Sequence, residues 1–336
     1  MATFVRTQEV AHEIGERGRL ALRVTNPDVE MRGDDGTVAR VRTSFEIRAA
    51  SDAEADEIFD SLRYRVTEGA GSLEVSEPKH DSGAGLGSLV RLLGIGSSQV
   101  DTRVEVDAPR HADLRFDGVS ADVTATGFRG AQEYRTVSGD LVLDGVGGDV
   151  RIKGVSSDIS LRAAAPLSSL EINTVSGDIS AVAPRIEHVR AATVSGDVEL
   201  EGVLAAGAEH RIETVSGDAS LGVTDNLTLE VRGLSTDADV RLPHRSEGSR
   251  DRRRYVIGDG GAQLLFSSMS GDVEVRPPRR SGSAPTPPTP VAPPAPPRPP
   301  SVDEDEQLAV LRALERGEID VDEATRRLAR RERSDV

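Results

Sequence analysis

The chain has 336 residues with 41 Lys and Arg against 57 Asp and Glu, a formal net charge of −16. A surface this negative repels nucleic-acid phosphates and anionic lipid head groups, which argues against both as partners. The sequence contains no cysteine, so it excludes a disulfide framework, a thiolate zinc site and a cysteine nucleophile.

Residues 1–16 form an N-terminal segment that lacks the basic start and apolar stretch of a secretory signal. No apolar run in the chain approaches the length of a membrane span. We therefore expect a cytoplasmic protein without a membrane span.

Residues 17–50 resemble a degenerate opening of a β pattern, with Leu20 and Leu22 before a turn at residues 26–28 and Met31 after it. A short helix is predicted near residues 51–63, because Ser51 and Glu54 form a capping box ahead of an apolar stripe. A stack of β repeats needs its open ends covered, so this region is expected to cap the stack.

A glycine-rich segment follows at residues 83–94. It lacks the Lys-Ser/Thr ending and the strand-to-helix context of a phosphate-binding loop. Its apolar residues, Leu89, Val90, Leu92 and Leu93, are either an exposed docking patch or, more commonly for so short a run, packing onto a neighbouring sheet.

The dominant feature is a seven-residue phrase that occurs nine times between residues 119 and 275: apolar, Ser, Gly, Asp, apolar, any residue, apolar. The spacings between its aspartates are 18, 9, 9, 20, 19, 21, 19 and 35 residues, so the period is about twenty. The aspartates are Asp122, Asp140, Asp149, Asp158, Asp178, Asp197, Asp218, Asp237 and Asp272.

Ser-Gly-Asp is turn chemistry, and the apolar alternation after it predicts a strand with one buried and one wet face. A second alternating run usually separates two phrases, so one period holds about two short strands and two turns. A hairpin-sized unit cannot bury its apolar face alone, but stacked neighbours can. The sequence therefore predicts an all-β fold, a β-solenoid or stacked two-sheet repeat architecture, over residues 17–277.

The 35-residue gap before Asp272 is explained by an insertion around residues 245–254. Its arginines indicate either a solvated hairpin tip, which we favour, or a site for an anionic partner.

Residues 278–302 form a proline-rich linker, predicted to be extended and semi-rigid. Residues 303–333 then predict a small helical hairpin with a glycine stop at Gly317. About thirty residues cannot support an independent core, so the hairpin is expected to dock on another copy of itself, on a partner or on the β-repeat domain. The predicted contact residues are Leu308, Leu311, Leu314 and Leu328.

The repeated aspartates are interpreted as turn residues that accept backbone amides, with calcium as the weaker alternative. None of the six histidines forms a helical metal pair or a triad, although His188 and His210 lie 22 residues apart, near one period. We predict no catalytic residue, no metal site and no cofactor.

The Thr-Val-Ser-Gly-Asp phrases and the strands after them resemble the bacterial putative-adhesin family of β-strand repeat proteins, also called domain of unknown function 4097, over roughly residues 17–277. The stretch from Leu308 to Ala324 is similar to the short helical SHOCT-like module found beside such domains in some cell-envelope-stress proteins. The resemblance implies a non-enzymatic interaction role.

The sequence thus predicts a bacterial β-repeat interaction or scaffold protein, whose C-terminal hairpin mediates oligomerisation or partner docking. Two alternatives stay open. A polysaccharide-acting β-helix enzyme would need paired carboxylates, although the chain has no Trp, three Tyr and six Phe. A calcium-stabilised surface adhesin would use the aspartates.

Overall fold

The computed structural model describes residues 2–78, 100–223, 226–249 and 252–278. They lie within one compact unit, Met1–Arg279, which we call the β body. The glycine-rich segment 83–94, the C-terminal hairpin 303–333 with its four predicted contact leucines, and residues 279–302 of the linker lie outside the described residues.

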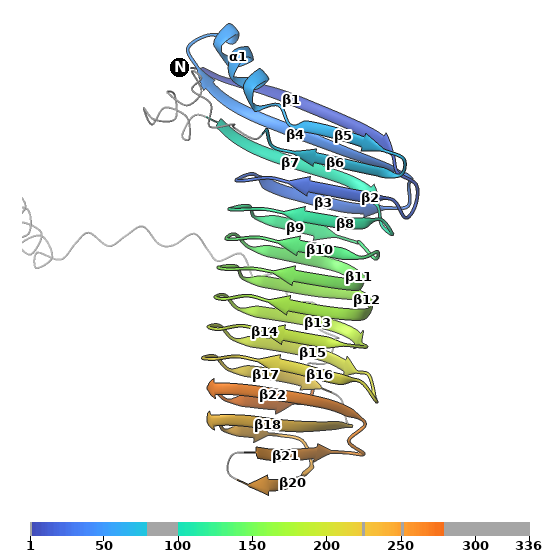
Figure 1. Cartoon of the computed structure of the whole chain (residues 1–336), viewed down its shortest axis with the longest axis vertical. Coiled ribbons are helices and arrows are strands. Elements are labelled where there is room, and N and C mark those ends of the chain that lie inside the picture. Colours follow the sequence, from blue (N-terminus) through green and yellow to red (C-terminus); the bar gives the residue numbers. More distant parts are fainter. Residues whose placement is uncertain (1, 79–99, 224–225, 250–251, 279–336) are drawn as a thin grey trace, which may run out of the picture. The chain divides into compact units, whose positions relative to one another are not determined.

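One column of strands, mostly parallel and in register, includes those that lead into the Ser-Gly-Asp turns (Figure 1). The column contains β5 (Arg65–Gly69), β6 (Ser72–Ser76), β2 (Arg19–Arg23), β8 (Asp113–Asp117), β10 (Gln132–Arg135), β14 (Val189–Ala192), β16 (Glu209–Glu213), β22 (Ala262–Ser270) and β18 (Leu227–Ser235).

The second column includes the strands that follow these turns. It contains β1 (Ala2–Glu13), β4 (Val38–Ala49), β7 (Val100–Pro109), β3 (Asp28–Asp34), β9 (Val123–Thr126), β13 (Ile179–Ile186), β15 (Val198–Leu204), β17 (Ala219–Val223), β23 (Val273–Arg276) and β19 (Ala238–Val240). Two long strands, β11 (Leu141–Lys153) and β12 (Ile159–Asn173), run through both columns and join them into one continuous sheet. The predicted all-β repeat architecture, with two strands per period, is confirmed.

The core lies between the two columns. Along β8, Leu114 and Phe116 are buried while Arg115 between them faces outward, as the pleat of a half-buried strand requires. The same alternation recurs from coil to coil, so the inward residues of all the coils form a single apolar cluster. A single period could not bury its own apolar face, and the stacking of neighbouring coils buries it.

Both ends of the stack are interleaved. Near the N-terminal end, β2 pairs with β6 and β8, and β3 pairs with β7 and β9, so the first coil lies between two coils that come later in the chain. Near the C-terminal end, β22 lies between β16 and β18, and β23 lies between β17 and β19. The insertion therefore explains only part of the 35-residue gap before Asp272, because the last coil also returns to fill a place in the stack.

The β body begins at β1 rather than at residue 17. All twelve residues of β1 pair with β4, which in turn pairs antiparallel with β7. The sequence did not show this strand because no residue of β1 is buried, which leaves it without the apolar alternation that marks a strand.

The one helix of the described residues, α1 (Asp52–Leu62), contacts β4 and β1 near this end of the stack (Figure 1). It begins with the predicted capping box: Ser51 Oγ accepts from Glu54 N at 3.2 Å, and Glu54 Oε2 accepts from Ala50 N at 2.7 Å. None of the helices in the described part of the chain is long and apolar enough to cross a membrane.

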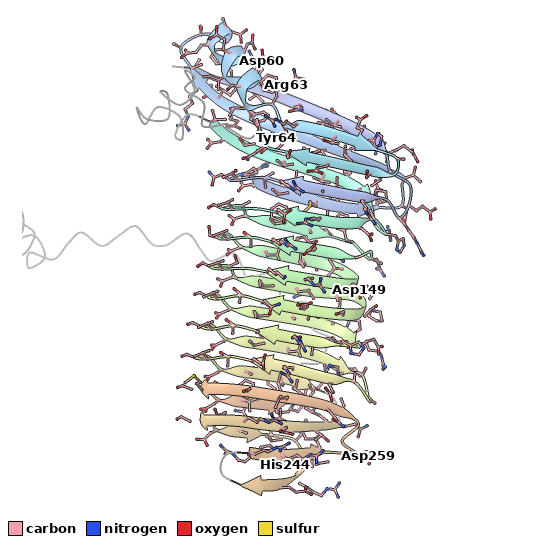
Figure 2. The ribbon with its side chains drawn as sticks, in the orientation of Figure 1. Asp60, Arg63, Tyr64, Asp149, His244 and Asp259 are labelled. Carbon is pink, nitrogen blue, oxygen red and sulfur yellow. The ribbon has the colours of Figure 1, made fainter. Side chains whose placement is uncertain are left out.

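At the other end, the insertion forms the antiparallel hairpin of β20 (His244–Ser249) and β21 (Arg252–Ile257), which extends the first column beyond β18 (Figures 1 and 2). Two of its arginines bond within the protein. Arg252 donates to both carboxylate oxygens of Glu230, at 2.8 and 3.1 Å, and Arg253 donates to the backbone oxygen of Thr236. These bonds tie the hairpin to the last coil.

Candidate interaction surfaces

The turn edge, where the first column passes into the second, carries a file of aspartates. Six of these carboxylates each accept a hydrogen bond from the backbone amide of the aspartate in the next coil. The bonds run from Asp140 N to Asp122, from Asp178 to Asp158, from Asp197 to Asp178, from Asp218 to Asp197, from Asp272 to Asp218 and from Asp237 to Asp272, all at 2.8 or 2.9 Å. The interpretation as amide-accepting turn residues fits these six bonds.

Two members of the sequence pattern depart from this ladder. Asp149 is not in the file: it pairs with Ser169 at the opposite edge of the stack (Figure 2), because its phrase falls at half a period. The step from Asp140 to Asp158, where Ser157 replaces glycine, has no such bond among the described residues. The file therefore holds eight aspartates rather than nine.

The serines of the same turns form a ladder of their own between the two columns of strands. It consists of isolated parallel bridges from Ser120 to Ser270. From Ser138 onward each serine amide donates to the carbonyl of the apolar residue in the previous coil, as Ser195 N does to Val175 O at 2.9 Å. The glycine after the serine is required by the close approach of coils. A Cβ on Gly196 would lie 2.2 Å from Gly177 O, and the φ angle of Gly196 is +136°.

The apolar residue that opens the phrase is exposed in seven copies, whereas Val146, which opens the half-period phrase of Asp149, is buried. Seven such residues stand one above another along the turn edge, each between 42% and 57% exposed. We call them the valine file: Val119, Val137, Val155, Val175, Val194, Val215 and Met269. In the first coil Thr25 takes this place, since its carbonyl accepts from Ser120 N.

The valine file was not predicted from the sequence. A signal was present, because the apolar residue is out of phase with the buried residues of the strand before it, as Val137 is with Gln132 and Tyr134. A contiguous exposed apolar strip marks an interaction surface more often than scattered exposed residues do.

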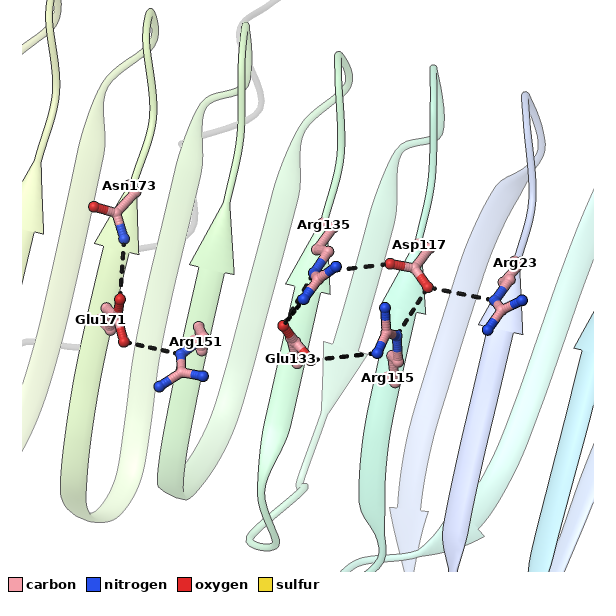
Figure 3. A network of polar contacts seen from close by, with 8 residues as sticks. All are labelled: Arg23, Arg115, Asp117, Glu133, Arg135, Arg151, Glu171 and Asn173. Carbon is pink, nitrogen blue, oxygen red and sulfur yellow. Dashed lines mark hydrogen bonds and ion pairs between the residues drawn. The ribbon is translucent and has the colours of Figure 1, made fainter.

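The outer face of the first column is covered by ion pairs that cross from coil to coil (Figure 3). Asp117 contacts Arg23, Arg115 and Arg135 at 3.5, 3.0 and 4.0 Å. Further along the stack, Glu171 on β12 contacts Arg151 on β11 at 2.8 Å. Each exposed pair contributes at most about 1 kcal/mol, so the main consequence is a face whose charges are mutually neutralised.

Two grooves lie on this face. One, of about 650 Å³, is lined by Arg115, Glu133, Arg151 and Glu171 among others, and by no Phe or Tyr among the described residues. The second, of about 460 Å³, holds His188, Glu209 and His210. Their carboxylates are the groups that a polysaccharide-acting enzyme would use.

Two carboxylates near the second groove have shifted pKa values. A hydrogen bond from Arg252 lowers the pKa of Glu230, and a hydrogen bond from Arg185 lowers that of Glu187. A general acid needs the opposite shift.

The two histidines noted in the sequence do come close in the stack, because Arg190 pairs with Arg211 in the next coil and the charge of His188 acts on His210. His210 points inward and is 1% exposed; its Nε2 lies 3.1 Å from Ala205 O, while its Nδ1 has no hydrogen-bond partner among the described residues. Burial lowers the pKa of His210. In the described part of the chain, no three His, Asp or Glu side chains gather as a metal site.

Comparison with known proteins finds a family model that matches the middle of the chain. Residues 90–211 match the Toastrack DUF4097 family model. This match supports the resemblance drawn from the Thr-Val-Ser-Gly-Asp phrases, and it covers most of the sequential coils. A comparison with curated proteins finds no match.

Solved structures also align along most of the β body. A putative adhesin from Parabacteroides distasonis aligns at 11% identity and a TM-score of 0.35, covering 81% of this chain and 97% of its own. A putative adhesin from Parabacteroides merdae aligns at 10% and 0.33, covering 81% and 96%. A putative lipid binding protein from Parabacteroides distasonis aligns at 12% and 0.31, covering 81% and 96%. With TM-scores this low, the fold assignment rests on the strand pairings themselves.

Proposed function

We propose that this protein is a non-enzymatic β-repeat interaction protein and that its turn edge is the docking surface. The valine file carries the proposal. Threonine has nearly the shape of valine and already occupies the equivalent place in the first coil as Thr25. Stacking of the coils therefore does not require an apolar side chain there, whereas binding to an apolar partner surface does.

The family resemblance extends the proposal to cell-envelope stress or surface functions. In that setting a long repeat surface displays one kind of contact many times. The multiplicity raises the avidity of a partner without requiring a strong single contact.

Photo-crosslinking in the native cells tests the docking surface. A photoreactive residue replaces Val175, in the valine file, or Val142, which is 40% exposed on the outer face of the second column. We expect a discrete protein adduct from position 175 and none from position 142. Equal adducts from both positions, or none from any position of the file, would count against the turn edge as the docking surface.

We further propose that the C-terminal hairpin, residues 303–333, mediates oligomerisation or partner docking through Leu308, Leu311, Leu314 and Leu328. The support is its predicted apolar face and its size, too small for a core of its own. Light scattering of the full chain beside a chain ending at Arg280 tests this. A defined oligomer formed only by the full chain supports self-assembly, and two monomers rule it out.

The competing function is a polysaccharide-acting enzyme, and the 650 Å³ groove favours it. Release of reducing ends from acidic polysaccharides by the purified protein would establish that function. We expect no release, because the groove carboxylates Glu133 and Glu171 are already engaged by arginines at 2.6 and 2.8 Å.

A further inference from the structure

Two files of opposite character share the turn edge. Val137 and Asp140, for example, are three residues apart in one turn, so their Cα atoms are at most about 11 Å apart. Coils repeat at about 4.8 Å, so the seven positions of the valine file extend over about 29 Å. A single elongated ligand lying along the stack can therefore contact both files at once.

The aspartate file carries charge that the described part of the protein leaves largely unneutralised. All eight aspartates are exposed, and the only ion pair found for them among the described residues is Asp237 with Arg253, at 3.4 Å. The neighbouring sheet face differs, because its carboxylates are paired with arginines (Figure 3).

The amide bonds hold the aspartates in place without removing their charge. Each of six carboxylates has one oxygen bonded to the next coil, so the file is a fixed row of anions about 4.8 Å apart. Like charges at this distance repel, and cationic side chains that lie along the row relieve the repulsion. The row therefore favours a ligand with repeated positive charges.

The repeat distance selects the shape of that ligand. Side chains on one face of an α-helix recur with a pitch of about 5.4 Å, close to the coil spacing. Side chains on one face of an extended strand recur at about 6.6 to 6.8 Å, which loses register with the coils within two or three steps. A helix of about nineteen residues matches the 29 Å of the valine file.

We propose that the turn edge binds a cationic amphipathic α-helix of a partner protein, laid along the stack axis. Its apolar side chains contact the valine file, and its arginines or lysines reach the aspartate file. The inference rests on the proposed function and adds the chemistry of the partner. An anionic membrane surface is disfavoured as the partner, because the aspartate file repels it.

The test measures binding of a fluorescent 18-residue helical peptide with leucines on one face and lysines on the other, by anisotropy with the full-length protein at 150 mM salt. One variant carries Val137→Thr, Val155→Thr, Val175→Thr and Val194→Thr, which keep the side-chain shape. A second carries Asp178→Asn, Asp197→Asn and Asp218→Asn, which keep the oxygen that accepts the amide. We expect each to weaken binding about tenfold or more, equivalent to about 1.4 kcal/mol.

The matched controls separate this site from general attraction to an acidic protein. Glu57→Gln, Asp60→Asn and Asp259→Asn together remove the same three charges from exposed positions elsewhere on the β body, and should change binding less than twofold. A scrambled peptide of the same composition should bind weakly. Equal loss in the control variant, or equal binding of the scrambled peptide, overturns the proposal. Thermal melts confirm that each variant folds.

The two proposals fail in different ways. If position 175 crosslinks to a partner in cells but the cationic peptide does not bind, the partner has another chemistry and only this inference is wrong. If neither is observed, the turn edge is not a docking surface.

Discussion

The middle of the β body and its two ends use the same coil in different ways. From β9 to β17 each coil follows the previous one along the chain, so its contacts come mostly from residues about twenty positions away. At the ends the order is broken. Leu20 pairs with Leu114, and Ile212 pairs with Phe266.

This difference bears on how the stack resists opening. In repeat proteins each unit contacts only its neighbours, and terminal units tend to fray. Here the first and the last coils of the chain each lie between two other coils, so neither can leave without breaking two sets of strand pairings. Both ends are closed by pairings between strands far apart in the chain, and such pairings form slowly. We therefore expect the coils of the β body to unfold together rather than one by one from the ends.

The largest expected effect comes from the interleaved coil at the C-terminal end. Phe266 is fully buried in β22 between β16 and β18. Phe266→Ala should lower the free energy of unfolding by about 3 to 5 kcal/mol, measured by chemical denaturation. Met269→Ala in the same strand is the control, because Met269 is 57% exposed. Similar losses for the two variants would mean that this coil does not contribute to the common core.

The next effect belongs to the middle of the stack. Gly196→Ala should cost about 1 to 3 kcal/mol, because its new Cβ meets Gly177 O and its φ angle is unfavourable for alanine. Gly207→Ala is the matched control: its φ is +76° with no atom within 4 Å, so it isolates the backbone strain. If both variants lose equal stability, close approach of the coils is not what selects glycine at the turn.

A pH-dependent effect is expected from His210, which lies inward beside the coil of His188 and Glu187. Burial lowers its pKa, and the His188 charge lowers it further, while Ala205 O and Glu187 act in the opposite direction. The unfolded chain therefore binds a proton more readily, so stability falls as the pH drops through the ordinary histidine range near 6.5, by at most about 1.4 kcal/mol per pH unit.

His210→Leu should remove that pH dependence, because leucine does not titrate. A leucine fits the site, since Leu264 occupies the same inward position in the neighbouring coil. Melting temperatures of the wild type and the variant between pH 7.5 and 5.5 measure it. Parallel pH profiles would show that His210 is not the titrating group.

The smallest effect concerns the cap at the N-terminal end. Ser51→Ala removes the acceptor for Glu54 N and should cost about 1 kcal/mol. Hydrogen exchange should show the loss in α1 and not in β2 or β3, since those strands are held inside the stack. Faster exchange in β2 would indicate that the helix, rather than the interleaving, protects the first coil.

Local features of this fold could be predicted from sequence because they depend on neighbours in the chain. Ser51 and Glu54 defined the start of α1, and the alternation around Leu20 and Met31 marked β2 and β3. The aspartates were correctly placed in turns, except for Asp149, whose phrase looks the same but falls at half a period.

Other features depend on which coils become neighbours, and no local pattern records that. Every coil presents nearly the same edges, so the sequence of β22 is compatible with a place on either side of β18. The exposure of the valine file was missed for a related reason, because the serine ladder that turns Val175 outward forms only between coils.

The sequence by itself thus determined the repeat, the turn chemistry and the two-strand coil, since these follow from backbone preferences and apolar alternation within about twenty residues. Only the tertiary structure decided the stacking order at the two ends, the alignment of the aspartates and the exposure of the valines. These depend on hydrogen bonds and packing between segments up to about ninety residues apart, as between β2 and β8, and become defined only when the coils meet.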